Sequence, residues 1–347
     1  MVCNLLKCIY LGYNRFRCLI MSSKCKYFWK NQSGVAVKYL KCGRTNLNEK
    51  LPLVYFIIPG NPGCVRFYED FADSLHQKTN IPVWGISHTG HSKLPSVGPP
   101  ENLEKQKFQQ PDREEAALQK QIEIKVDFLQ KEVFPVAEKV VLVGHSIGCY
   151  IIIQIMEKIQ EKYPEKVKKG VLLFPTIEKM QWTPQGKKLT PILTNARWLF
   201  MFAGMVASYT PPWVFRRIYP GLSKEEFVYE TIEENFPSME VLDCITYMGL
   251  QEMYMVDRRD DNLVEKFLDR LIFYYGSHDE WCPIEFYENL DAKYGHVTGS
   301  HIEVAEQGIP HAFVLTHSHR VAEKVAEWSE EFEGKSLENK SQDFEII

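Results

Sequence analysis

Residues 140–143 read VVLV and are followed by GHSIG at residues 144–148 and then by a helix-like stretch. The apolar run predicts a buried strand, so the pentapeptide forms the turn between a strand and a helix. A serine in such a turn has a strained backbone that exposes its side chain above the sheet. Both flanking positions must be glycine, because a Cβ there would strike the neighbouring strand or helix. The pattern is typical of a nucleophile elbow, with Ser146 as the nucleophile between Gly144 and Gly148.

Short apolar strands alternate with helix-periodic segments on both sides of this turn. We predict strands at 34–42, 53–58, 81–87, 140–143, 170–174, 271–276 and 300–305, and helices at 66–78, 113–132, after the elbow, and at 319–333. This alternation indicates a mostly parallel sheet with helices on both faces, and with ligands at the carboxyl ends of the strands. The predicted fold class is therefore α/β.

The chain of 347 residues, 45% of them hydrophobic, is long enough for one large α/β domain with an insertion. We divide it into five parts: a basic, cysteine-rich extension (1–33), the first part of the core (34–175), a cap insertion (176–262), the second part of the core (263–333) and a tail (334–347). The tail is predicted to be disordered, because it combines charge with little apolar periodicity.

Composition excludes several classes of protein. A net charge of −4 gives no electrostatic footprint for nucleic acid. Nine cysteines, an odd number without any Cys-x-x-Cys, favour reduced thiols over a disulfide framework and indicate no zinc site. Four of them lie in the basic extension, where membrane contact, acylation, mitochondrial targeting and a dispensable role all stay open.

A serine nucleophile needs a histidine base, and the base needs a carboxylate that fixes its tautomer. After a nucleophile elbow the expected chain order is serine, acid, histidine. Asp279 directly follows a predicted strand and is our choice for the acid, with Glu280 and Glu178 as alternatives. Of the six histidines after Ser146, only His311 lies in a loop between a predicted strand and the terminal helix. We therefore predict His311 as the base.

An oxyanion that forms during acyl transfer needs two backbone N–H donors. The amide of Ile147, directly after the nucleophile, is one predicted donor. The other is expected from residues 59–63, PGNPG, which follow the first buried strand. Pro59 and Pro62 have no N–H, so Asn61 is the predicted second donor.

Residues 198–215, WLFMFAGMVASYTPPWVF, form an uncharged run of 18 residues inside the cap. Pro211 and Pro212 interrupt it, and the 13 residues before them would form about 20 Å of helix, shorter than a hydrocarbon core of about 30 Å. We predict that the run dips into a lipid monolayer or membrane surface, with Trp198, Tyr209, Trp213 and the flanking arginines (Arg197, Arg216 and Arg217) at the interface. A lid helix buried over the active site is the alternative.

Six stretches carry a resemblance to a known family. They are FIIPGNPG (56–63), SHTGHS (87–92), VLVGHSIG (141–148), LLFPTIEKM (172–180), FYYGSHDEWCP (273–283) and GIPHAF (308–313). Together they resemble the lipid droplet-associated hydrolase family of the α/β-hydrolase superfamily. The resemblance implies the α/β-hydrolase fold and the same triad of Ser146, Asp279 and His311. It also implies hydrolysis of sterol esters or acylglycerols at the cytosolic face of lipid droplets and endoplasmic reticulum.

Three functions are compatible with these features. The first is an ester hydrolase that forms an acyl-enzyme on Ser146 and uses no metal or organic cofactor. The second is a lipid droplet surface protein with little turnover, and the third is a hydrolase of soluble small esters or thioesters. The three catalytic residue types stand in the expected order, which favours the first.

Overall fold

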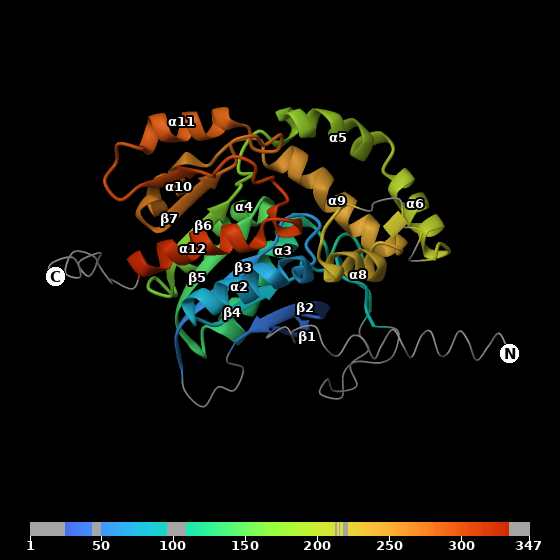
Figure 1. Cartoon of the computed structure of the whole chain (residues 1–347), viewed down its shortest axis with the longest axis horizontal. Coiled ribbons are helices and arrows are strands. Elements are labelled where there is room, and N and C mark those ends of the chain that lie inside the picture. Colours follow the sequence, from blue (N-terminus) through green and yellow to red (C-terminus); the bar gives the residue numbers. More distant parts are fainter. Residues whose placement is uncertain are drawn as a thin grey trace, which may run out of the picture.

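An eight-stranded sheet forms the centre of the described structure (Figure 1). The computed structural model describes residues 25–43, 50–95, 109–211, 214, 216–217 and 221–332. The strands are β1 (Cys25–Gln32), β2 (Val35–Cys42), β3 (Leu51–Ile58), β4 (Val83–Ile86), β5 (Ala137–His145), β6 (Val167–Leu173), β7 (Leu271–Tyr275) and β8 (His301–Val304). Their order across the sheet is β1-β2-β4-β3-β5-β6-β7-β8. β2 is antiparallel to β1 and β4, and the other neighbours are parallel, which confirms the predicted sheet.

Helices cover both faces of this sheet (Figure 1). α2 (Glu69–Thr79) and α12 (Ser318–Phe332) pack together on one face. The helices on the other face are α3 (Leu118–Phe128), α4 (Ile147–Ile159) and α10 (Asp261–Phe267), and α11 (Ile284–Tyr294) lies beside β8. Strands that are covered on both faces read as continuous apolar runs. Val140, Val141 and Leu142 of β5 are accordingly fully buried.

The first strand corrects the predicted domain boundary at residue 33. We expected residues 1–33 to lie outside the core, but Cys25–Gln32 is strand β1 and pairs along its whole length with β2. β1 is an edge strand with mostly half-buried side chains, and such strands accept lysines, so its basic composition concealed it. Residues 1–24 and the predicted disordered tail, 334–347, lie outside the described residues.

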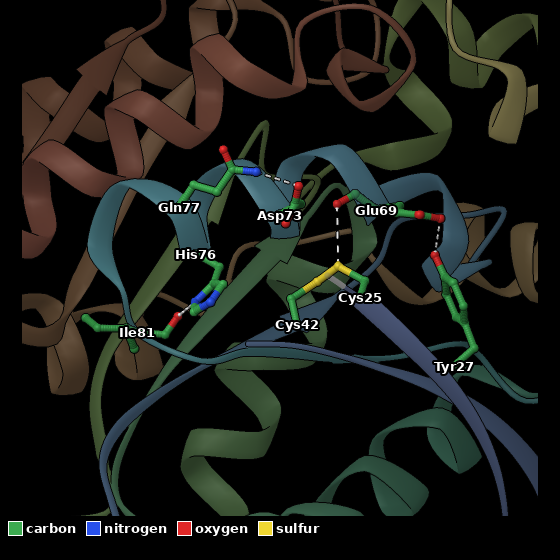
Figure 2. Close-up of a disulfide and its surroundings, with 8 residues drawn as sticks. All are labelled: Cys25, Tyr27, Cys42, Glu69, Asp73, His76, Gln77 and Ile81. Atoms are coloured by element: carbon green, nitrogen blue, oxygen red, sulfur yellow. Dashed lines mark hydrogen bonds between the residues drawn. A yellow bond between two sulfur atoms is a disulfide. The ribbon is translucent and has the colours of Figure 1, made fainter. Parts of the chain in front are cut away.

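A disulfide joins Cys25 of β1 to Cys42 of β2 (Figure 2). The prediction of reduced thiols is therefore wrong for this pair, although Cys64, Cys149, Cys244 and Cys282 are free and buried. The bonded cysteines are 17 positions apart, but the hairpin places them directly opposite each other, with their Cα atoms 4.0 Å apart. Spacing alone did not reveal this because the pairing depends on strand register. Figure 2 also shows a hydrogen bond from the Tyr27 hydroxyl to Glu69, which ties β1 to α2.

The cap lies between β6 and β7 in the chain. Its helices are α5 (Pro184–Asn195), α6 (Trp198–Ser208), α8 (Glu226–Asn235) and α9 (Met239–Met255). In Figure 1 they lie together beside the sheet, at the right of the view, and α9 packs against both α5 and α6. None of the helices in the described part of the chain combines the length and the apolar character needed to cross a membrane.

Candidate active site

Ser146 lies between the end of β5 and the start of α4, with φ 54° and ψ −123°. Non-glycine residues rarely adopt a positive φ, and such strain is frequent at functional sites. A Cβ on Gly148 would lie 2.2 Å from the carbonyl oxygen of Ile58, and a Cβ on Gly144 would lie 2.8 Å from the backbone of Gly148. Because backbone atoms cannot swing away as a side chain can, only glycine fits at these two positions.

The structure brings three predicted residues together. His311 Nε2 lies 2.9 Å from Ser146 Oγ, and His311 Nδ1 lies 2.6 Å from Asp279 Oδ2. Asp279 follows β7 and His311 follows β8, so adjacent parallel strands deliver the two side chains to the same edge of the sheet. The two alternative acids lie elsewhere. The carboxylate of Glu280 pairs with Lys188 at 2.9 Å, and that of Glu178 pairs with Arg259 at 2.8 Å.

Four donors surround the carboxylate of Asp279. Its Oδ1 accepts the backbone N–H groups of Trp281 (2.7 Å) and Cys282 (3.1 Å), and its Oδ2 accepts the Cys282 thiol (3.0 Å) as well as His311. Burial acts to raise the pKa of Asp279, but these hydrogen bonds and the charge of His311 outweigh it, and the pKa is lowered. The carboxylate is therefore ionised and held in one orientation. Cys282 was not among the predicted site residues.

Asp279, Cys282 and His311 also have the ligand types of a zinc site, with ligand atoms within 4.8 Å of one another. Metal binding would require the thiolate form of Cys282. In this structure the thiol donates to Asp279 Oδ2 at 3.0 Å, and burial raises its pKa well above the ordinary value. All three side chains are thus engaged in one hydrogen-bonded cluster around His311 Nδ1, and we assign no metal to them.

The loop at residues 59–63 packs directly on the serine. A Cβ on Gly60 would lie 3.0 Å from the Cβ of Ser146. Ile147 begins α4 on the other side of the serine, so the two predicted oxyanion donors belong to segments that flank Ser146. The side chain of Asn61 turns toward the cap, where its Nδ2 donates to the carbonyl of Ile245 (3.0 Å) and to Glu252 Oε1 (2.8 Å).

Tyr68 and His145 connect this loop to the histidine of the site. The Gly60 N–H donates to the Tyr68 hydroxyl (2.8 Å), which donates to His145 Nδ1 (2.6 Å). His145 Nε2 then donates to the backbone carbonyl of His311 (2.8 Å). Burial, assisted by the charge of His311, lowers the pKa of His145 to about 3, so its ring is neutral and has one donor and one acceptor nitrogen.

His88 and His91 both form hydrogen bonds with Gly63 of the same loop. The Gly63 N–H donates to His91 Nδ1 (2.9 Å), and the Gly63 carbonyl accepts the backbone N–H of His88 (2.8 Å). Burial is the main cause that lowers the pKa of both imidazoles, to about 3 for His91. Both rings are therefore neutral, and the His91 ring supports the loop through Nδ1.

Glu252 is a buried acid that was not among the predicted site residues. Its side chain lies on α9 next to Asn61 and is 4% exposed. Burial raises its pKa from 4.5 to about 8, and the hydrogen bond from Asn61 opposes this increase only in part. Helix periodicity in the sequence could have indicated that Glu252 is buried, because it lies four residues after Met248, on the buried face of α9.

The raised pKa of Glu252 predicts a pH-dependent stability difference between the wild type and Glu252→Gln. Between pH 4.5 and about 8 the unfolded chain has an ionised Glu252, whereas the folded chain keeps it protonated. Unfolding therefore releases a proton, and the wild type loses stability relative to Glu252→Gln as the pH rises through this window, by a few kcal/mol in total. Melting temperatures of both proteins at several pH values measure the difference. A constant difference across the window would contradict the assignment.

Comparison with known proteins identifies relatives. A family model described as "Lipid-droplet associated hydrolase" matches residues 52–314. A protein from Mus musculus named lipid droplet-associated hydrolase is 37% identical over 318 residues, which cover 85% of this chain and 92% of the relative. The protein of the same name from Homo sapiens is 35% identical over 307 residues, with 85% and 91% coverage.

Solved structures agree at the level of the fold. An epoxide hydrolase from Vigna radiata has a TM-score of 0.56 at 14% identity, over 91% of this chain and 100% of that one. A thermophilic esterase from Thermogutta terrifontis has a TM-score of 0.53 at 14% identity, over 88% and 99%. These similarities confirm the α/β-hydrolase fold. With a family model that spans most of the sequence and relatives above 30% identity, the chain belongs to the lipid droplet-associated hydrolase family.

Proposed function

We propose that this chain is a serine ester hydrolase that acts on lipid esters. The observation that carries the proposal is the position of His311, within hydrogen-bond distance of Ser146 Oγ on one side and of Asp279 Oδ2 on the other. This is the relation of nucleophile, base and acid that acyl transfer to a serine requires. The strained backbone of Ser146 supports the same roles.

The proposed reaction has two halves. Ser146 Oγ attacks the ester carbonyl while His311 Nε2 accepts its proton, and the ionised Asp279 stabilises the imidazolium. The carbonyl oxygen becomes an oxyanion that the backbone N–H groups of Asn61 and Ile147 stabilise. The C–O bond to the alcohol then breaks, and His311 gives its proton to the leaving oxygen. In the second half His311 deprotonates water, which releases the acid from the acyl-enzyme and regenerates Ser146.

Sterol esters and acylglycerols are the proposed substrates. Relatives of this chain are named for association with lipid droplets, whose contents are neutral lipid esters. The proposed location is the cytosolic face of lipid droplets and endoplasmic reticulum. Labelling with a fluorophosphonate probe, followed by a panel of acyl esters presented on emulsions, tests the proposal. Ser146-dependent turnover of emulsified esters is expected.

Two other outcomes favour the alternatives. Droplet binding without Ser146-dependent turnover would favour a droplet surface protein, and turnover restricted to water-soluble esters or thioesters would favour a soluble-ester hydrolase.

Exposed apolar side chains on α6 support the proposed lipid contact. Trp198, Phe202 and Tyr209 are 61%, 53% and 87% exposed, and Leu199 and Val206 are also exposed. Gly204, on the opposite side, is buried, and a Cβ there would lie 2.5 Å from the side chain of Leu242 on α9. An exposed apolar face of this kind favours contact with a lipid surface over a buried lid. The structure describes residues 198–211 and 214 of the predicted run, so Trp213 lies outside the described residues.

Substitution of Trp198, Leu199, Phe202 and Val206 with serine or asparagine is expected to release the protein from droplets. Each large apolar side chain contributes roughly 1.5–3 kcal/mol when buried, and four together exceed what a marginal interfacial anchor can lose. Hydrolysis of a short soluble ester should persist, because the triad belongs to the core. Co-flotation with droplets and soluble-ester turnover measure the two effects. Val297→Asn, at an apolar residue 39% exposed outside the cap, is the control. Retained flotation, or loss of folding, would contradict the anchoring role.

A further inference from the structure

We propose that Glu252 on cap helix α9 is a positioning residue for the oxyanion hole: by holding the side chain of Asn61, it fixes the backbone N–H of Asn61 toward the reacting carbonyl. This inference rests on the proposed function above. Glu252 touches neither the substrate nor Ser146 in this scheme and acts only through Asn61.

The contacts of Asn61 carry the inference. Its Nδ2 donates to two acceptors on one helix, the carbonyl of Ile245 at 3.0 Å and Glu252 Oε1 at 2.8 Å. These residues are about two helical turns apart, and Gly249 lies between them. A Cβ on Gly249 would lie 3.4 Å from Asn61 Nδ2. The Asn61 amide therefore packs against α9 at Gly249, between its two acceptors.

These two hydrogen bonds fix the position of the Asn61 side chain. Its other polar atom, Oδ1, is buried and has no hydrogen-bond partner in the described part of the chain. The orientation of the Asn61 side chain therefore depends on the two hydrogen-bond acceptors that α9 provides for Nδ2. Because Gly60 packs on the Cβ of Ser146, a change in the adjacent Asn61 would shift the loop segment that carries the proposed donor.

A carboxyl group at position 252 is explained by this hydrogen bond and not by an ion pair. Within the described residues Glu252 forms no salt bridge, and it is 4% exposed. A buried carboxyl without a cation is costly unless it is hydrogen-bonded. Leucine or methionine would fill the same space without this cost, but neither could accept a hydrogen bond from Asn61.

The test compares Glu252→Leu with Glu252→Gln on a short soluble ester. Leucine removes the acceptor, and we expect kcat to fall about 10- to 100-fold, with KM changed less than about twofold, because the misplaced donor weakens stabilisation of the transition state. Glutamine keeps an Oε1 acceptor in the same place and should restore kcat to within about threefold of the wild type.

A double-variant cycle separates positioning from general damage to the fold. Asn61→Ala removes the same link from the other side but keeps the backbone N–H. It should lower kcat about as much as Glu252→Leu, and the double variant should lose little more. Should Glu252→Leu fail to fold, Asn61→Ala and Glu252→Gln carry the test by themselves.

Several outcomes would overturn the inference: an unchanged kcat in Glu252→Leu or in Asn61→Ala, a Glu252→Gln variant as impaired as the leucine variant, or losses that multiply in the double variant. Failure of the proposed function looks different. In that case the wild type would show no turnover that Ser146→Ala removes, and the inference would fall with it.

Discussion

Ser146→Ala will abolish fluorophosphonate labelling and reduce ester turnover by about 10⁴-fold or more, while the melting temperature changes little. The alanine cannot form the covalent bond to the probe or to the acyl group, and what remains is weak catalysis by the oxyanion hole. Folding should persist, because the Oγ contributes little packing. Labelling and turnover of the purified variant measure the effect.

Ser318→Ala is the matched control, since Ser318 is a buried serine in α12 whose Oγ bonds the carbonyl of Val314. It should retain full labelling. Equal labelling of Ser146→Ala and the wild type would show that the nucleophile is another residue.

Asp279→Asn is expected to lower kcat about 10³- to 10⁴-fold. The carboxylate accepts the Nδ1 proton of His311 at 2.6 Å, and this contact selects the tautomer that leaves Nε2 free to accept the proton of Ser146. An amide at this position favours the wrong tautomer and does not stabilise the imidazolium. The backbone donors of Trp281 and Cys282 can still bond the amide oxygen, so the loop should keep its shape.

Glu280→Gln and Glu178→Gln provide the comparison. Both carboxylates pair with basic residues away from His311, at Lys188 and Arg259, and both variants should stay within a few-fold of the wild-type kcat. If one of them loses activity as Asp279→Asn is expected to, the acid has been assigned to the wrong residue.

The elbow and the sheet were predictable because their signals are local. The apolar run before Ser146 indicates a buried strand. The two glycines that flank the serine indicate positions where neighbouring backbone segments come too close for a residue with a Cβ. Asp279 and His311 could be chosen because parallel strands present the residues after their carboxyl ends at one edge of the sheet. In the structure His311 lies within hydrogen-bond distance of both Ser146 and Asp279, at the distances given above.

The supporting contacts could not be predicted, because they join residues far apart in the sequence. Asn61 and Glu252 are 191 positions apart, and Tyr68 and His145 are 77 apart. Nothing in the local sequence around Tyr68 or His145 shows which polar group each will meet across the core. The disulfide was missed for a related reason, since the hairpin register, and not the spacing, places Cys25 opposite Cys42.

The ribosome makes α6 before it makes either Asp279 or His311, because α6 ends at Ser208 and β7 begins at Leu271. Ser146 is made earlier still. Since chains fold progressively from the N-terminus during synthesis, the nascent protein carries Ser146 and its apolar helix while Asp279 and His311 do not yet exist. Under the proposed function, a growing chain can bind a lipid surface through α6 before it can hydrolyse a lipid ester there. Under the same proposal, newly made protein is inactive until His311, which follows strand β8, has been made.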